Sequence, residues 1–172
     1  AGDALQDADY NTAVGYSALT SDTLGSQSVA IGTGALGQQN FTSATNAYNT
    51  AVGMSAGGAV TTGTQNTLIG GLAGDAQTTA NNTTAVGYAA LGANTTGDNN
   101  TAVGANTLDA NTTGASNVGV GAAALGLNTT GSSNTAIGTL ALDANTTASN
   151  NTAVGDGSLG ANTTGASNTA VG

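Results

Sequence analysis

Small apolar and polar residues recur along this chain at a fixed interval. A Gly that follows Val or Ile marks each recurrence, at Gly15, Gly32, Gly53, Gly70, Gly87, Gly104, Gly121, Gly138, Gly155 and Gly172. Successive marks lie seventeen positions apart, except that Gly53 follows Gly32 after twenty-one. Self-similarity at a short fixed period is typical of solenoids, in which each coil stacks on its neighbours.

Two columns of bulky apolar residues accompany this anchor Gly. One position before it stand Val86, Val103, Val120, Ile137 and Val154, and four positions after it stand Leu91, Leu108, Leu125, Leu142 and Leu159. We expect each column to stack on itself as a structural ladder along the solenoid axis. Gly57 and Gly74 replace Leu in the third and fourth coils.

Each repeat is predicted to consist of strands and turns. Thr101–Val103 is strand-forming by composition, residues 111–113 are predicted as a second strand, and Gly104 and Gly114 supply the corners. Repeats this short, with two Gly corners in each, leave no room for a helix. The predicted fold is therefore all-β, a parallel β-solenoid (β-roll or β-helix) of about nine coils about 4.8 Å apart.

The alternation in Thr101–Val103 predicts that the sheet has two apolar faces. Ala102 points to one side, and Thr101 and Val103 point to the other. One side closes the interior of the coil, and the other is expected to pack on copies of the same chain. The alternative is that Ala is simply a small residue tolerated on an exposed face. A narrow coil with only Ala102, Val103, Leu108 and Ala110 to bury has little surplus stability alone. We therefore expect a homo-oligomer, with side-by-side coils in a homotrimer as the first choice.

The chain is predicted to have one repeat domain, residues 11–172, preceded by a lead-in or cap at residues 1–10. Four extra residues fall within 38–48, and this insertion holds Phe41 and Tyr48. Large aromatic side chains are rare here and enriched at interfaces, so we expect a contact loop. The alternative is a plug that packs on the third coil. Because the last repeat stops soon after it begins, we expect the chain to be part of a longer protein.

Composition excludes several classes of partner. The chain has no Lys, Arg, His, Pro or Cys, and its nine acidic residues, all Asp, give a net charge of −9. Binding to nucleic acid needs cations against the phosphates, and so does docking on anionic membranes. We expect neither partner. No apolar run approaches the roughly 20 residues of a membrane span.

The repeats resemble two groups of surface proteins. Ser28-Val-Ala-Ile-Gly32 resembles the head-repeat motif of trimeric autotransporter adhesins, whose heads are trimers of left-handed parallel β-rolls. The commoner Asn-Thr-Ala-Val-Gly, followed by Ala-Leu and then Asn-Thr-Thr-Gly, resembles repeats of phage tail-fibre proteins and related bacterial surface proteins. The resemblance covers residues 11–172. It implies an extracellular, cell-surface or virion location.

The sequence offers few residues of the kinds that act in catalysis or bind metal ions. No His, Cys, Lys or Glu is present to act as a base or nucleophile, and the Asp residues are scattered singly. We expect no enzyme activity and no cofactor. Asp and Asn oxygens suit calcium, but neither an EF-hand loop nor the Gly–Asp nonapeptide of calcium-binding β-rolls occurs. Calcium is not expected.

The Asn-Thr-Thr segments permit two interpretations. Asn94, Asn111, Asn128, Asn145 and Asn162 each match the glycosylation acceptor pattern. The structural alternative, which we prefer, is that Asn in a solenoid corner bonds turn backbone and stacks as an amide ladder.

The threonines of these segments form a regular hydroxyl and methyl array. Thr95, Thr112, Thr129, Thr146 and Thr163 recur once per repeat, each followed by a second Thr. The array is similar to the flat Thr ladders of some ice-binding β-solenoids. The alternative is that Thr is a strand former on a solvated face.

Five positions after the anchor, Asp and Gly alternate strictly. The column reads Gly58, Asp75, Gly92, Asp109, Gly126, Asp143 and Gly160. Like charges on adjacent coils would lie about 4.8 Å apart, and on alternate coils about 9.6 Å. The alternation is therefore interpreted as charge spacing, or as the trace of a duplicated two-coil unit.

These features together predict a structural and adhesive fibre module, a rigid rod with a surface-binding region. A cell-surface glycan or receptor is an expected partner besides the chain itself. The alternatives are a subunit that polymerises end to end into an extracellular filament, and an ice-binding β-solenoid.

Overall fold

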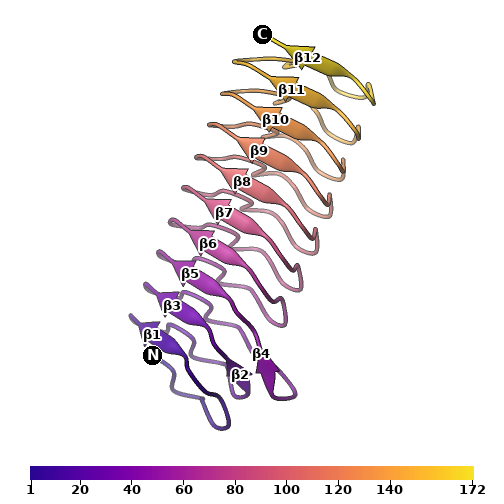
Figure 1. Cartoon of the computed structure of the whole chain (residues 1–172). Coiled ribbons are helices and arrows are strands. Elements are labelled where there is room, and N and C mark those ends of the chain that lie inside the picture. Colours follow the sequence, from indigo (N-terminus) through magenta and orange to yellow (C-terminus); the bar gives the residue numbers. More distant parts are fainter.

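The protein is an all-β parallel β-solenoid of about nine coils with about 17 residues per turn and no helix. The computed structural model describes the whole chain, residues 1–172. Figure 1 shows the coils stacked into a rod, with the N-terminus at one end and the C-terminus at the other.

Ten strands form the main sheet, and each of the nine intervals between successive strands is one coil. They are β1 (Thr12–Val14), β3 (Val29–Ile31), β5 (Thr50–Val52), β6 (Thr67–Ile69), β7 (Thr84–Val86), β8 (Thr101–Val103), β9 (Val118–Val120), β10 (Thr135–Ile137), β11 (Thr152–Val154) and β12 (Thr169–Val171). They pair in parallel and in chain order, so that Ala102 of β8 lies beside Ala85 of β7. The fixed period sets this register, because it places equivalent residues of adjacent coils side by side.

The inner side of this sheet faces a narrow core. Ala102 and Leu108 are fully buried, and their equivalents in the other coils form one continuous apolar cluster. Val103 instead points outward and is 37 % exposed, and Ala110 is only partly buried. Within the single chain, therefore, only Ala102 and Leu108 of the four expected residues are fully buried, because the strand alternation turns Val103 away from the core.

Two columns of Asn complete the interior. The Asn100 side chain donates to Gly114 O at 2.7 Å and accepts from the backbone N–H of Asn117 in the next coil at 2.9 Å. Asn111 donates to Gly114 O at 2.9 Å and to Asn94 Oδ1 at 3.0 Å. These buried amides therefore tie each coil to its neighbours along the rod.

Residues 111–113 do not form the predicted second strand. The N–H groups of both Thr112 and Thr113 donate to the same carbonyl, Thr129 O, at 2.9 and 3.3 Å. A strand ladder needs a separate partner for each bonding residue. The inward Asn111 amide instead holds this segment as a bend.

The insertion adds a small second sheet beside the first coils. β2 (Gly25–Ser26) pairs in parallel with β4 (Thr45–Asn46), and Figure 1 shows β4 at the side of the rod, in a wider loop than in later coils. Residues 1–10 lie against the first coil, where Gly2 N donates to Ala18 O and Gln6 N donates to Thr23 O. Leu5 packs against the end of the core.

Candidate functional site

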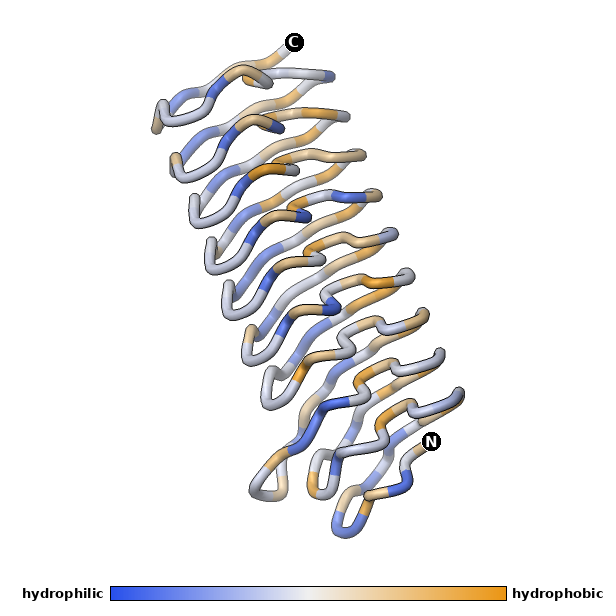
Figure 2. Tube along the Cα trace, turned by 180° about the vertical axis from the view of Figure 1, so that it is seen from behind, coloured by the Kyte–Doolittle hydropathy of each residue, from blue (hydrophilic) through white to orange (hydrophobic).

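The outer side of the main sheet is the most regular surface of the rod. Its two outward columns, which we call the sheet face, consist of Thr12, Val29, Thr50, Thr67, Thr84, Thr101, Val118, Thr135, Thr152 and Thr169, and of Val14, Ile31, Val52, Ile69, Val86, Val103, Val120, Ile137, Val154 and Val171. Every one is Thr, Val or Ile. Figure 2 shows that hydrophobic and hydrophilic segments recur at the same places in coil after coil.

The turns of each coil hold this face in register. Gly104, directly after β8, has a φ of 135°, and a Cβ on it would lie 2.7 Å from Gly121 O of the next coil. Leu108 adopts a φ of 53° and so places its side chain in the core. Because the same turn recurs in each coil, equivalent residues of the sheet face lie at equivalent places.

The hydroxyls of the sheet face have no hydrogen-bond partner within the chain. This holds for all eight of its Thr residues, among them Thr84, Thr101 and Thr152. Their hydroxyls are thus left to solvent or to a partner, and they lie beside a ladder of Val and Ile methyl groups.

The other Thr array, for which the sequence left ice binding or a solvated face open, is different in its first column. The second Thr of each pair, such as Thr113, is exposed. Thr95 donates its hydroxyl to Thr112 O at 3.0 Å, and Thr112 and Thr129 bond the following coil in the same way. These three hydroxyls are engaged with backbone, and the residues are half-buried. The sequence could not separate the two arrays, because both recur with the same period.

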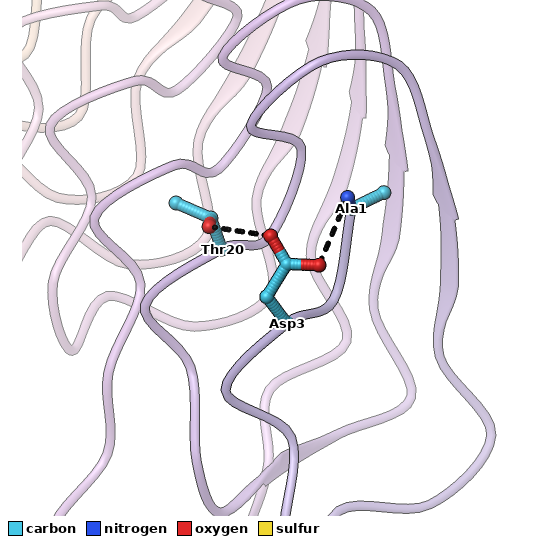
Figure 3. Close-up of polar contacts among 3 residues, drawn as sticks. All are labelled: Ala1, Asp3 and Thr20. Carbon is cyan, nitrogen blue, oxygen red and sulfur yellow. Dashed lines mark hydrogen bonds and ion pairs between the residues drawn. The ribbon is translucent and has the colours of Figure 1, made fainter.

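The acidic residues lie away from the sheet face. None of the nine Asp residues belongs to its two columns. The one ion pair joins the N-terminal ammonium group to Asp3 Oδ1 at 3.4 Å, and Figure 3 shows Thr20 on the other oxygen of the same carboxylate. The sheet face is therefore uncharged in a chain whose net charge is −9.

Two open hollows of about 530 and 500 Å³ lie along another side of the rod. Their lining includes Asp75 in the first and Asp109 and Asp143 in the second, from the column in which Asp alternates with Gly. A Cβ on Gly92 would lie 2.6 Å from Asp109 Oδ1 and 3.7 Å from Asp75 Oδ1. The carboxylates of Asp75 and Asp109, from the coils on either side, thus both lie beside Gly92.

This crowding changes the acidity of the two carboxyl groups. Burial raises the pKa of Asp75, and the negative charge of Asp109 raises it further. Burial also raises the pKa of Asp109. Gly92 therefore leaves space for the side chains of Asp75 and Asp109. No three acidic side chains gather in an arrangement that could hold a metal ion.

The glycosylation candidates occupy the core. Asn94, Asn111, Asn128 and Asn145 are fully buried, and Asn162 is half-buried. Every member of this column after Asn94 donates its side-chain amide to the Asn of the preceding coil and to a turn carbonyl further along its own coil. A glycan on any of the four buried amides would break the amide ladder, so these four cannot be acceptors in the folded rod.

A second buried Asn column was not among the predicted sites. It consists of Asn100, Asn117, Asn134 and Asn151, all fully buried. Its recurrence four positions before the anchor Gly was a readable signal in the sequence. The sequence did not reveal that these amides point inward, because Asn is usually exposed.

The insertion presents one of its two aromatic residues. Phe41 is 5 % exposed, while Tyr48 is 51 % exposed. The Phe41 ring packs toward Gly25, and the Phe41 N–H is 3.5 Å from Asp22 Oδ1. As a partner contact, Phe41 was predicted wrongly. Its ring is packed inside the chain, beside Gly25 of the first coil.

Comparisons of the chain with protein-family models, with curated proteins and with solved structures found no match. No helix suited to crossing a membrane is present.

Proposed function

We propose that this protein is a structural and adhesive fibre module, a stiff rod that carries the sheet face as its contact surface. The observation that carries the proposal is the sheet face itself: ten parallel strands in register whose outward residues are all Thr, Val or Ile. An exposed surface of this regularity, free of charge, is suited to contact rather than to solubility.

The interior supports the role of a rod. Each coil bonds its neighbours through strand pairing and through two Asn columns, so bending would break buried hydrogen bonds. Buried polar groups that lose their partners cost about 1–3 kcal/mol each. The rod should therefore resist bending along its whole length.

The resemblance of the repeats to phage tail fibres and to trimeric autotransporter heads supports an extracellular or virion setting. We propose that such rods act as homotrimers, with the sheet face turned either inward against the other copies or outward toward a target. A cell-surface glycan or receptor is the proposed target of an adhesive fibre. End-to-end polymerisation is the alternative mode of assembly.

Sedimentation and cysteine labelling test this proposal together. Sedimentation equilibrium distinguishes a discrete trimer from a monomer and from heterogeneous polymer. The chain has no Cys, so Thr101→Cys reports on the sheet face alone, and Thr113→Cys, at an exposed site away from the sheet, is the matched control. Fast maleimide labelling of both variants is expected for an outward face. Protection of the Thr101 variant alone would place the face between copies, and a compact globular particle would contradict the rod.

A further inference from the structure

The sheet face is a two-dimensional lattice. Adjacent strands of a sheet lie about 4.8 Å apart, and the Thr and the Val or Ile of one strand are two residues, about 6.6 Å, apart. Sheets normally twist by about 20–25° per strand, yet Figure 1 shows the strands from β1 to β12 running in nearly the same direction. The lattice therefore keeps nearly one orientation over the length of the rod.

The side chains on this lattice are stiff. Val, Ile and Thr branch at Cβ, and this restricts their χ1 angle. Each Thr offers a methyl group and a hydroxyl that no group of the protein engages. Eight of the ten strands thus repeat the same pattern of one hydroxyl and several methyl groups, and β3 and β9 carry Val in place of Thr. This pattern is ordered before any partner binds.

Protein partners are usually held in a different way. Binding energy in protein interfaces concentrates in Trp, Tyr and Arg, while Thr and Val are under-represented among such residues. The sheet face has no large aromatic side chain and no charge. A second protein would also have to satisfy eight free hydroxyls in the contact, since buried unsatisfied polar groups are costly. A partner that is itself a regular lattice, and that supplies hydrogen bonds everywhere, fits these features better.

We propose that the sheet face binds ice. Water oxygens on the prism faces of ice form rows with a spacing close to that between the coils. The Thr hydroxyls are placed to hydrogen-bond such rows, while the methyl groups of Thr, Val and Ile order the water between them. Binding rests on the proposed function in one respect, since the sheet face must be turned outward. The Thr95 array is a built-in comparison, because three of its hydroxyls are already bonded to backbone.

Thermal hysteresis of the full chain is the direct test. The wild-type protein is expected to depress the freezing point below the melting point in a concentration-dependent way and to shape growing ice crystals. Thr101→Tyr places a bulky ring in the middle of the lattice and is expected to reduce the hysteresis to less than half. Thr113→Tyr, in the same coil but away from the sheet, is expected to retain it. Val103→Ile is expected to be neutral, because Ile31, Ile69 and Ile137 already occupy that column.

Circular dichroism and melting temperature keep the test interpretable, since both Tyr variants replace outward side chains and should fold. Absence of hysteresis in a wild-type protein whose Thr101→Cys variant labels quickly would overturn ice binding and leave the rod proposal standing. A trimer that protects Thr101→Cys and lacks hysteresis would overturn ice binding in favour of contact between copies. Equal loss in Thr101→Tyr and Thr113→Tyr would also overturn it, because the effect would not belong to the sheet face.

Discussion

At the scale of single residues, the backbone of each turn decides which side chains can occupy it. The anchor Gly has a φ that L side chains rarely adopt, and it lies against the backbone of the next coil. Four positions later the chain takes the left-handed conformation at Leu, as in Leu108 with a φ of 53°. Such conformations cost about 1–3 kcal/mol each and persist only when the surrounding structure fixes them. Burial of Leu in the core supplies that stabilisation.

Gly104→Ala tests the anchor position. The added Cβ would lie 2.7 Å from Gly121 O, and the φ of 135° is unfavourable for Ala. We expect a loss of about 3 kcal/mol or more in the free energy of unfolding, measured by chemical denaturation. Gly126→Ala is the matched control with a smaller expected loss. The nearest atom to its added Cβ is Ala123 O at 3.1 Å, and Asp109 and Asp143 already stand in its column. Equal losses would mean that the backbone conformation is not what selects Gly.

Asp109→Asn tests the crowded carboxylates. The pKa values of Asp75 and Asp109 are raised above 3.8 in the folded state. As the pH rises from acid to neutral, these two carboxyl groups lose their protons at a lower pH in the unfolded chain than in the folded one. They therefore lower the free energy of unfolding between acid and neutral pH. Asp109→Asn should therefore raise the melting temperature at pH 7 and change it little near pH 3. Asp156→Asn, at an exposed site in another column, should have little effect at either pH.

At the scale of the coil, a large core side chain in one coil compensates for small residues in its neighbours. Gly57 and Gly74 lack the core Leu of other coils, but Leu68 stands where other coils have a small residue. A Cβ on Gly57 would lie 2.7 Å from Leu68 Cδ1, and one on Gly74 would lie 2.9 Å from Leu68 Cδ2. One Leu from the strand β6 thus fills the space of two missing side chains. Gly119 makes similar room for the Thr107 methyl group.

Exchange of these residues tests the compensation. Leu68→Ala alone leaves a cavity and is expected to cost about 2–5 kcal/mol. Gly57→Leu alone should overpack the same space. The triple variant Leu68→Ala, Gly57→Leu, Gly74→Leu restores the pattern of the other coils and should recover most of the lost stability in denaturant titrations. Leu127→Ala, at an exposed Leu, is the control. If the triple variant were no more stable than Leu68→Ala, the space would not be shared.

At the scale of the whole molecule, the rod is nearly one-dimensional. Each coil contacts only its neighbours, so the stability of a solenoid is close to a sum over coils and their interfaces. Polar ladders contribute as much to its continuity as the small core does. The flat sheet face is a consequence of this stacking, because it arises only when many identical strands are placed in register.

Removal of one coil tests this modularity. Deletion of residues 134–150 takes out one whole repeat and leaves every column in register. The shortened protein is expected to fold, to show strand-type circular dichroism, and to be about 4.8 Å shorter by small-angle scattering. Deletion of residues 134–141 is the control, since it takes out part of a coil and misaligns the columns beyond it. If both shortened chains folded equally well, register between coils would not govern the fold.

The sequence by itself determined the period, the parallel stacking and the absence of helix. A repeat this short, with Gly corners, leaves no other way to bury its Ala and Leu columns. The alternation in Thr101–Val103 separated Ala102 from Thr101 and Val103, but only the structure showed that Ala102 faces the core. Only the tertiary structure decided where the side chains of the turn residues lie and what they contact. Asn111 lies inside, Thr112 bonds the next coil, and Phe41 is buried.

The physical reason lies in the turns. Left-handed residues such as Asn106 and Leu108 break the simple alternation of a strand, so the spacing of residues no longer predicts which side chains point inward. Both Thr arrays share one period. Only the placement of neighbouring carbonyl groups engages the hydroxyls of Thr95, Thr112 and Thr129 and leaves those of the sheet face free. The pattern of the sequence therefore determines the architecture, and contacts between coils determine which hydroxyl groups remain free on the surface.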